Sequence, residues 1–311
     1  MNSENIEVVI PAFNGETMIS DCISSVMEIL PDSRITVVND FSSDSTARIV
    51  SEDFPSVNLI SNESNLGFGQ SCNIGAFQSN CDWVLLLNQD AILRKINLEN
   101  IGDITANDKV SVIGGKTEYR NGTLLHNIGF HPTLLRLLFF WPTLPLRFLG
   151  LNFGGLYETS PSLYINRSEV EWITGSCLFV RRDLFELQGG FDERFFIYVE
   201  EVEHAHRTKK EGFKIIFEPT IISMHENRSG IGMSPFSVYQ TIRGQRIFIS
   251  TNNGKIVSYV FMLSACLSCI LSGLISSSLL WWSPKKRTSS WGLLKGGIRA
   301  LFYGWGPEAG P

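Results

Sequence analysis

Acidic side chains gather in the sequence GGFDERFFIYVEEVEHAHR, which covers residues 189–207. Glu200, Glu201 and Glu203 follow directly after an apolar, aromatic stretch. From Val199 onward the apolar residues recur with helical spacing, which places the three carboxylates on the first turn of a short helix. Carboxylates at the edge of an apolar wall can take part in acid–base chemistry, but acids in a first turn also simply complement the helix dipole. Both interpretations stay open from these residues alone.

Neighbouring cations distinguish the three carboxylates. Glu200 has His204 four residues later and Glu203 has Arg207, the spacing of ordinary surface pairs on a helix. The residue four positions after Glu201 is an alanine, so Glu201 has no such cation. We therefore expect Glu201 to be the carboxylate most available for chemistry, with Glu203 in reserve.

The composition is that of a globular protein with an apolar component: 311 residues, 18% charged and 43% hydrophobic. A net charge of −5 argues against nucleic acid as the main partner. The six cysteines are scattered, and the pair Cys266-x-x-Cys269 lies in an apolar run without histidines, so we expect reduced thiols and no zinc site. No signal peptide is expected before the first strand, because the N-terminal residues are acidic.

The first ninety residues alternate apolar strands with helical patterns, which predicts a mostly parallel α/β sheet. Strands are expected at 8–10 (stopped by Pro11), 35–38, 57–60 and 83–87, and a helix at 18–30. Later in the chain, apolar residues predict two further strands at 215–217 and 221–224. Asp44 is expected to cap the helix that follows it. Polar residues follow three of these strands, at 11–14, 39–40 and 88–90. Ligands of such sheets bind at the carboxyl ends of strands, so these residues predict a binding site.

The glycines Gly67 and Gly69 do not complete a G-x-G-x-x-G motif, and no Walker sequence occurs, so ordinary dinucleotide and P-loop sites are excluded. Asp90, directly after a predicted strand, has two interpretations. It is either a turn residue or a ligand for the divalent cation that a nucleoside diphosphate requires.

The motifs, taken in order, resemble those of family 2 glycosyltransferases over roughly residues 6–246. They are VIPAFN (9–14), VVNDFSSD (37–44), NLGFG (65–69), LNQD (87–90) and the GGFDERFFIYVEEVE stretch. The set looks most like the bacterial branch that includes rhamnosyltransferases of O-antigen and other surface-polysaccharide assembly. The resemblance implies the GT-A fold, a Rossmann-like mixed sheet flanked by helices. It also implies an inverting transferase that moves a sugar, with rhamnose as one candidate, from a dTDP- or UDP-sugar to a lipid-linked saccharide.

The resemblance assigns the nucleotide-binding residues to the ends of the first strands. Pro11, Phe13 and Asn14 would line the pocket for the base and ribose. Asp40, or alternatively Asn39, would hydrogen-bond the edge of the pyrimidine.

The diphosphate and its metal would be held further along the chain. Asn65 and Gly67 would approach the ribose and phosphates. The sequence Asn88-Gln89-Asp90 stands where the family carries a D-x-D-like motif, so Asp90 would hold Mg²⁺ or Mn²⁺, with His225 as a second candidate ligand. Asn88 replaces the first acid of that motif, which removes one charge from the metal site.

Glu201 would be the catalytic base, in the place where the family usually has the aspartate of a Glu-Asp pair. Trp172 and Gly175 would approach the donor sugar or the acceptor. Arg243 and Arg246 would suit an anionic acceptor, although a plain surface helix explains them as well. Processive members carry Q-x-x-R-W here, whereas this chain has a glycine at 244, which favours the addition of a single sugar.

The C-terminal region predicts membrane association. Residues 256–282 carry no formal charge and are long enough to cross a bilayer, but Ser264, Ser268, Ser272 and Ser276 form a small polar stripe that favours another helix as neighbour. The basic cluster 285–287 makes a helix hairpin or in-plane association preferable to a single crossing. The apolar segment 134–151, interrupted by prolines, is either a core insertion or a membrane-contacting patch, and we favour the second.

The predicted organisation is a catalytic domain at 1–235 (nucleotide-binding half 1–115, acceptor half 116–235) and a membrane-associated helical region at 236–311. The expected location is the cytoplasmic face of the inner membrane, with a polyprenyl-pyrophosphate-linked saccharide as acceptor. Two alternatives stay open. A nucleotidyltransferase would show a basic glycine-rich phosphate loop that is missing here, and Asn88 together with the Glu-Glu pair leaves room for an inactive sugar-nucleotide-binding scaffold.

Overall fold

The computed structural model describes residues 2–131, 133–141, 156–225, 234–279 and 284–304. The chain forms two compact units, and each is described by itself. Unit 1 contains residues 1–130, 157–193 and 201–227, and unit 2 contains residues 131–156, 194–200 and 228–311.

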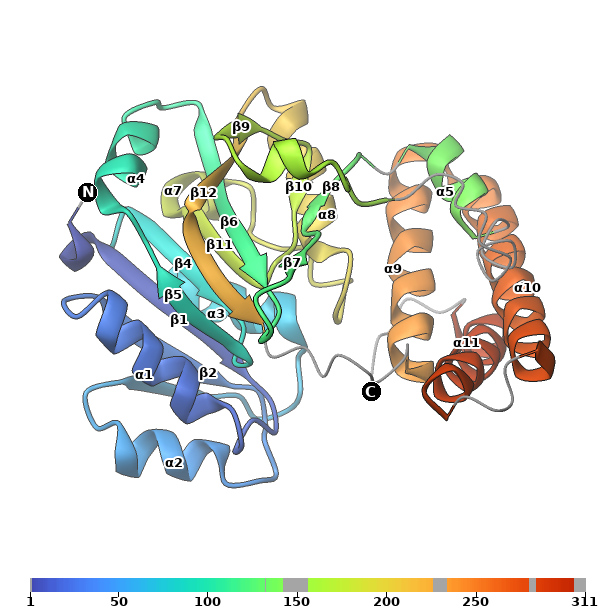
Figure 1. Ribbon diagram of the computed structural model, residues 1–311, viewed down its shortest axis with the longest axis horizontal. Coiled ribbons are helices and arrows are strands. Elements are labelled where there is room, and N and C mark those ends of the chain that lie inside the picture. Colours follow the sequence, from blue (N-terminus) through green and yellow to red (C-terminus); the bar gives the residue numbers. More distant parts are fainter. Residues whose placement is uncertain (1, 132, 142–155, 226–233, 280–283, 305–311) are drawn as a thin grey trace. The chain divides into compact units, whose positions relative to one another are not determined.

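A mixed sheet forms the centre of unit 1 (Figure 1), with strand order β3-β2-β1-β4-β11-β6-β12-β5. The strands are β1 (Ile6–Ala12), β2 (Arg34–Asn39), β3 (Asn58–Ser61), β4 (Trp83–Leu87), β5 (Ala91–Lys95), β6 (Val110–Glu118), β11 (Cys177–Arg181) and β12 (Lys214–His225). β7 (Leu124–Leu125) pairs with β6 and β9 (Ser168–Glu169) with β12, while β8 (Ile128–Gly129) and β10 (Trp172–Ile173) form a small second sheet. β1, β2, β3 and β4 are mutually parallel, and β11 and β5 run antiparallel to their neighbours.

Helices cover both faces of this sheet because β1 is apolar on both sides. Its residues Ile6, Val8 and Ile10 belong to the core that includes α1 (Ile19–Ile29). On the opposite face, α3 (Phe68–Gln78) lies so close that a methyl group at Gly75 would collide with Val9. The remaining helices of unit 1 are α2 (Thr46–Asp53), α4 (Leu98–Thr105), α7 (Arg182–Leu187), α8 (Glu200–Lys210, whose first residue falls in unit 2) and the short 3-10 helices Ser3–Asn5 and Pro161–Tyr164.

The predicted mixed α/β sheet flanked by helices is confirmed, with three local differences. β1 continues through Pro11, which pairs with Val38 in parallel register, so the proline does not stop the strand. The separate strands expected at 215–217 and 221–224 form one strand, β12, whose register shifts between Glu218 and Ile222 around Pro219. Ser45 is the N-cap residue of α2, although Asp44 accepts a hydrogen bond from the Thr46 backbone N–H (3.0 Å).

The described helices of unit 2 (Figure 1) are α5 (Leu134–Phe140), α9 (Pro235–Asn253), α10 (Lys255–Leu279) and α11 (Pro284–Tyr303). Glycines allow close packing of its helices, since a methyl group at Gly297 would lie 2.8 Å from Cβ of Cys269 on α10. The Trp141 indole donates to Gln245 of α9 (2.7 Å). Most of the apolar segment 134–151 lies outside the described residues. Within the described residues, α10 alone is long and apolar enough to cross a membrane, over Lys255–Ile275, and half of that stretch is buried.

Candidate active site

The ends of β1 and β4 are tied together by one side chain, Gln89. The Phe13 N–H donates to Gln89 Oε1 (3.0 Å), and Gln89 Nε2 donates to the Phe13 carbonyl (2.9 Å). A methyl group at Gly15 would collide with the same amide, so this position requires glycine. The pair fixes the backbone of Phe13, whose ring is partly exposed, next to the Asn88–Asp90 turn.

Asn14 connects the end of β1 with the loop after β2. Its backbone N–H donates to Ser42 Oγ (3.0 Å), and its side-chain Oδ1 accepts from the Ser43 N–H (2.8 Å). Asn14 has φ +48°, a left-handed conformation that asparagine tolerates better than most residues. Three of the loops that the sequence predicts for nucleotide binding are therefore joined to each other.

Asp40 is buried and holds the loop that contains Asn65 and Gly67. Its carboxylate accepts from the backbone N–H groups of Leu66 and Gly67 (both 2.8 Å) and from Asn62 Nδ2 (2.8 Å). Gly67 has φ +90°, which disfavours any other residue. In this structure Asp40 therefore positions a loop. The predicted contact of Asp40 with a pyrimidine would have to use the lone pairs of its carboxylate oxygens that do not accept from Asn62, Leu66 or Gly67. Asn39, its alternative, is also buried, and its Oδ1 accepts from the Ser42 N–H (3.2 Å).

Replacing Asp40 by asparagine tests this positioning role. The asparagine amide would face a backbone N–H, which leaves one buried donor unpaired, and we expect the free energy of unfolding to fall by about 1–3 kcal/mol. Binding of a nucleoside diphosphate should weaken as well, since the 62–67 loop is released. Urea denaturation and calorimetric titration measure the two effects, with the exposed Asp53→Asn as control. Unchanged stability of Asp40→Asn would refute the role.

Asp90 and His225 meet where β4 and β12 end, with 3.3 Å between Asp90 Oδ1 and His225 Nε2. Within the described part of the chain, Asn88 Oδ1 and His225 Nδ1 are buried without a hydrogen-bond partner. Carboxylate, imidazole and amide oxygen are ligand types that divalent cations accept, so these residues fit a metal. No group of three or more His, Cys, Asp or Glu side chains suited to a metal occurs among the described residues, so phosphate oxygens and water would complete the coordination.

The loop 174–176 brings Glu201 close to the Asn88–Asp90 turn. A methyl group at Gly175 would lie 3.8 Å from Glu201 Cβ and 3.4 Å from the Phe68 ring. The next residue, Ser176, accepts the Asn88 N–H through its carbonyl (3.1 Å). Two adjacent residues, Gly175 and Ser176, therefore link the predicted base to the predicted metal motif, and the contact of Gly175 with a sugar stays a prediction.

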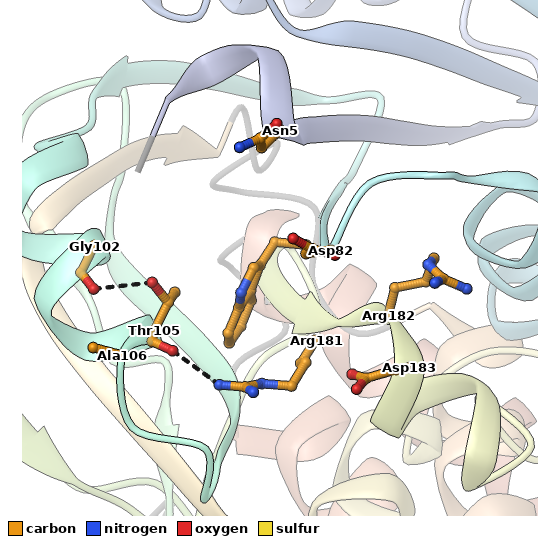
Figure 2. Close-up of a pocket in the computed structure, with 9 residues that line it drawn as sticks. Asn5, Asp82, Gly102, Thr105, Ala106, Arg181, Arg182 and Asp183 are labelled. Atoms are coloured by element: carbon orange, nitrogen blue, oxygen red, sulfur yellow. Dashed lines mark hydrogen bonds between the residues drawn. The ribbon is translucent and has the colours of Figure 1, made fainter.

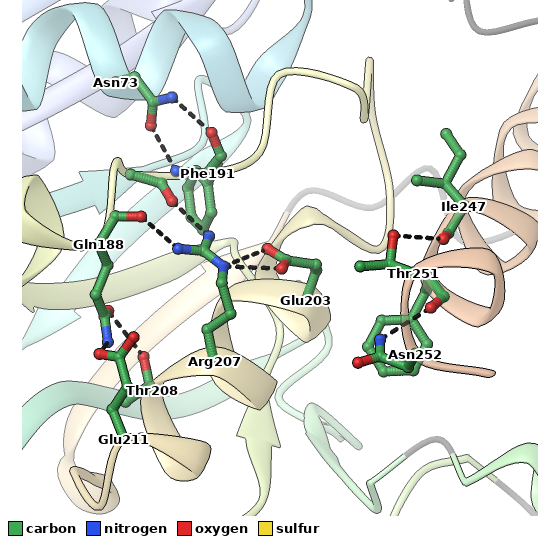
Figure 3. Close-up of polar contacts among 12 residues, drawn as sticks. Asn73, Gln188, Phe191, Glu203, Arg207, Thr208, Glu211, Ile247, Thr251 and Asn252 are labelled. Carbon is green, nitrogen blue, oxygen red and sulfur yellow. Dashed lines mark hydrogen bonds and ion pairs between the residues drawn. The ribbon is translucent and has the colours of Figure 1, made fainter. Parts of the chain in front are cut away.

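Burial separates the three carboxylates of α8. Glu200 and Glu203 are only 3% and 5% exposed, whereas Glu201 is half-buried and can be reached from solvent. Glu203 is fully engaged by Arg207, whose Nε lies 2.8 and 2.9 Å from its two oxygens (Figure 3). Arg207 also donates to the carbonyls of Gln188 and Gly190. Glu203 thus forms the predicted ion pair in a buried setting and holds the chain before α8, which leaves Glu201 as the reachable acid.

Asn73 of α3 anchors the segment that leads to α8. Its Nδ2 donates to the Phe191 carbonyl and its Oδ1 accepts from the Phe191 N–H, both at 2.8 Å (Figure 3). Gly190 has φ +68°, and a methyl group there would collide with Asn73 Oδ1. Sequence reasoning missed this positioning role because no local motif marks a helical asparagine that pairs with backbone 118 residues away. The positioning role of Gln89 was not predicted either, although the residues on both sides of it, Asn88 and Asp90, were predicted to belong to the site.

His204 is buried rather than paired at the surface as its spacing from Glu200 predicted. Its ring packs against the rings of Phe185 and Phe191, with centroids 5.0 and 5.6 Å away. Burial first, and then the positive charge of Arg207, lower the pKa of His204 from 6.5 to about 3. The imidazole is therefore neutral at pH 7 and provides no charge to Glu200.

This buried histidine predicts an acid-sensitive fold. Between pH 6.5 and 3 only the unfolded chain protonates His204, so its stabilising contribution is complete above pH 6.5 and declines as the pH falls towards 3. We expect it to lower the free energy of unfolding by about 2 kcal/mol between pH 8 and pH 5. Urea denaturation of His204→Phe should show a shallower pH dependence than the exposed control His126→Phe. If the free energy of unfolding changed equally with pH in the two variants, the buried neutral state of His204 would be contradicted.

Trp172 packs inside unit 1. It is buried, its indole N–H donates to the Phe130 carbonyl (2.8 Å), and its ring occupies the space next to Gly129, where a methyl group would collide with it. The predicted contact of Trp172 with a sugar is therefore not supported in this conformation, because its only donor is already used.

Arg243 and Arg246 of α9 are buried within unit 2, so the surface-helix interpretation is wrong. Arg243 Nη1 donates to the Arg194 carbonyl (3.0 Å), and burial lowers the pKa of both guanidinium groups. A methyl group at Gly244 would lie 3.0 Å from the Tyr198 carbonyl and 3.1 Å from the Val199 side chain. Gly244, which replaces the tryptophan of processive members, thus allows the 194–199 segment to approach α9.

The segment packed on α9 has a strained backbone. Tyr198 and Val199 have φ values of +69° and +77°, a region that is costly for β-branched residues in particular. Glu200 and Glu201 follow immediately, so the strain lies at the entrance to α8. Strained backbone of this kind is often found at functional sites and persists only where surrounding contacts hold it.

A pocket of about 540 Å³ lies at the opposite edge of the sheet (Figure 2). It is lined by Asn5 before β1, Asp82 and Trp83 at the start of β4, and Arg181 at the end of β11. Arg181 donates to the carbonyls of Thr105 and Asn107 (both 3.0 Å), and its guanidinium carbon lies 5.2 Å from the centroid of the Trp83 ring. Because β4 separates this pocket from the Asn88–Asp90 turn, the pocket is not part of the candidate active site.

A sheet with its polar loops joined at the carboxyl ends of β1, β2 and β4 has them where α/β proteins bind their ligands. Residues 7–156 match the sequence model of the family described as Glycosyl transferase family 2. This match covers just under half of the chain, and together with the relatives and solved structures below it supports a glycosyltransferase that resembles family 2 members.

Relatives and solved structures agree with this assignment. The chain is 26% identical to N-acetylglucosaminyl-diphospho-decaprenol L-rhamnosyltransferase of Mycobacterium tuberculosis (strain CDC 1551 / Oshkosh), over 65% of this chain and 69% of the relative. The mannosyltransferase PcManGT of Pyrobaculum calidifontis, solved with GDP-Man and Mn²⁺, has a TM-score of 0.56 at 13% identity, covering 96% of this chain and 87% of that one. TarS 1–349 of S. aureus, solved with UDP, has a TM-score of 0.52 at 16% identity, covering 96% and 91%. The structural likeness confirms the GT-A fold.

Proposed function

We propose that this glycosyltransferase moves a sugar from a dTDP- or UDP-sugar to a lipid-linked saccharide, with inversion at the anomeric carbon, in the synthesis of a cell-surface polysaccharide. The proximity of Glu201 to the Asn88–Asp90 turn, through Gly175 and Ser176, carries the proposal. The rhamnosyl relative, which its name describes as acting on a diphospho-decaprenol-linked sugar, supports rhamnose as the sugar and a polyprenyl diphosphate as the lipid.

Glu201 acts as the general base. Its carboxylate removes the proton of an acceptor hydroxyl while the hydroxyl oxygen bonds to the anomeric carbon of the donor. The bond between that carbon and the diphosphate oxygen breaks, and the nucleoside diphosphate leaves with the bonding electrons. Glu201 suits this task because it is half-buried next to Gly175 and reachable from solvent, whereas Glu200 and Glu203 are enclosed.

The donor lies along the carboxyl ends of β1, β2 and β4 in this proposal. Pro11, Phe13 and Asn14 border the base and ribose, and the 65–67 loop, held by Asp40, borders the phosphates. Asp90 and His225 would hold Mg²⁺ or Mn²⁺, which would neutralise the negative charge of the departing diphosphate. The neighbour solved with GDP-Man and Mn²⁺ supports a divalent metal without selecting between the two ions.

The acceptor side of the proposal uses Gly175 and the arginines of α9. Arg243 and Arg246 supply positive charge for a pyrophosphate-linked acceptor, provided that α9 exposes them when the acceptor binds. A lipid-linked acceptor places the reaction at a membrane, for which we propose the cytoplasmic face of the inner membrane. The apolar helix α10 is compatible with such an association.

A donor screen tests the proposal directly. The full chain is incubated with dTDP-rhamnose and with common UDP-sugars, with Mn²⁺ or Mg²⁺ and a short-chain polyprenyl-diphosphate saccharide. We expect acceptor-dependent release of one nucleoside diphosphate and a glycosylated lipid of matching mass. Tight donor binding without any release would favour the inactive scaffold. A parallel incubation with a nucleoside triphosphate and a sugar 1-phosphate tests the nucleotidyltransferase, which would form the nucleotide sugar and release pyrophosphate.

A further inference from the structure

One face of α10 is an exposed apolar stripe. Ile256, Val260, Leu263, Leu267 and Leu271 recur every three or four residues and are between 47% and 81% exposed. A soluble helix normally turns such residues inward. The exposed stripe therefore requires an explanation from its surroundings.

The buried face of α10 has the opposite composition. From Ala265 onward, the buried positions are small or polar: Ala265, Cys266, Ser268, Cys269, Ser272 and Gly273. At Gly273 a methyl group would lie 2.7 Å from Cβ of Leu294, so α11 packs tightly against this face. Small residues at the helix contact with leucines facing outward is the arrangement of helices that pack in lipid. Ser268 and Ser272 are buried, as the predicted serine stripe requires.

α11 presents a second exposed stripe with a different character. Trp291, Lys295, Ile298 and Phe302 share one face and are all exposed, and Lys295 Nζ lies 5.3 Å from the centroid of the Trp291 ring. Tryptophan and lysine side by side are typical of the boundary between lipid headgroups and acyl chains.

Charge is divided unequally between the two units of the sequence. Unit 2 contains twelve Lys and Arg residues and two acidic residues, a net charge of +10. Unit 1 contains the other 14 basic and 29 acidic residues, a net charge of −15. From residue 227 to residue 307 the sequence has no Asp or Glu. A surface that combines exposed leucines with positive charge is complementary to anionic lipid.

We propose that α10 and α11 dock flat on an anionic bilayer, with the leucine stripe of α10 inserted below the headgroups and the Trp291–Phe302 stripe of α11 at headgroup level. This inference deepens the proposed function, which needs a membrane but does not say how the chain binds one. Crossing is disfavoured because α11 packs along α10 and would bring Lys295 and Arg299 into the hydrocarbon.

Vesicle binding of the full chain, without donor or acceptor, tests the proposal. We expect the protein to sediment with phosphatidylglycerol/phosphatidylcholine vesicles and far less with phosphatidylcholine alone. Leu267→Glu and Leu271→Glu should each lower the partition coefficient about tenfold. The matched control is Leu187→Glu, because Leu187 is 79% exposed in unit 1 and lies outside the docking surface. Circular dichroism and nucleotide binding verify that the variants fold.

Labelling of introduced cysteines distinguishes flat docking from crossing. The six native cysteines are buried, so Asn253→Cys, at the end of α9, and Ser283→Cys, in the sequence between α10 and α11, place reactive thiols before and after α10 and outside the leucine stripe. We expect a membrane-impermeant maleimide added outside the vesicles to label both positions, and labelling of only one would overturn flat docking. Undiminished sedimentation of the glutamate variants would overturn the lipid-facing stripe. The lipid-facing stripe would also be overturned if the protein did not bind vesicles and instead formed a dimer in solution that Leu267→Glu dissociates. Because no sugar donor is present, these outcomes are independent of the proposed transferase activity.

Discussion

Glu201→Gln should lower the rate of sugar transfer by about 10²- to 10⁴-fold while donor affinity stays unchanged. The amide has nearly the same shape as the carboxylate but cannot take the acceptor proton, so the loss should fall on kcat rather than on KM. Transfer from radiolabelled donor to a lipid-linked acceptor measures the rate, and calorimetry measures donor binding. Turnover equal to wild type would exclude Glu201 as the base.

Two further variants separate chemistry from structure. Glu203→Gln breaks the buried pair with Arg207, and we expect it to lower stability more than it lowers the rate per folded molecule. Glu201→Asp shortens the side chain to the length usual in the family and should retain part of the activity. The exposed Glu63→Gln serves as control. Equal losses in the three glutamine variants would indicate a general effect of charge and not a base at position 201.

Asp90→Ala should weaken metal-dependent donor binding by at least about tenfold. The variant removes the carboxylate that faces His225 at 3.3 Å and leaves His225 as the remaining candidate metal ligand of the pair. Calorimetric titration of a nucleoside diphosphate with Mn²⁺, with Mg²⁺ and with EDTA should show that the wild type gains affinity from metal and that the variant does not.

Asp82→Ala is the matched control, because Asp82 is an exposed aspartate directly before the same strand, β4, at the opposite edge of the sheet. It should retain the full metal effect. His225→Ala should reduce that effect in the same direction as Asp90→Ala. A donor affinity that does not respond to metal in the wild type would show that Asn88, in place of an acid, has removed the metal requirement.

Sequence patterns predicted which polar residues lie at the carboxyl ends of β1, β2 and β4. Apolar strands followed by polar residues are a local signal, so Phe13, Asn14, Asp40 and Asp90 could be placed at one edge of a parallel sheet. The role of Asp40 could not be predicted, because whether a buried carboxylate faces a ligand or a backbone loop depends on where residues 62–67 lie. The GT-A architecture followed from the order of the motifs.

The positioning contacts were beyond sequence reasoning because they join distant segments. Asn73 pairs with Phe191 across 118 positions, and Gln89 with Phe13 across 76. Helical spacing correctly paired Glu203 with Arg207 but wrongly placed His204 at the surface, since spacing gives a face of the helix and not what covers it. The burial of Arg243 has the same origin: its guanidinium donates to the Arg194 carbonyl, 49 positions earlier in the chain, which no local pattern predicts.

Gly244 and Arg243 of α9 contact the 194–199 segment, so removing the C-terminal helices would also change the backbone that leads into α8. A chain ending near residue 235, where the sequence suggested that a catalytic domain stops, would lack the groups that hold Tyr198 and Val199 in left-handed conformation. The backbone would relax there, and the first turn of α8 would lose its fixed starting point. We therefore expect a fragment that ends before α9 to lose activity.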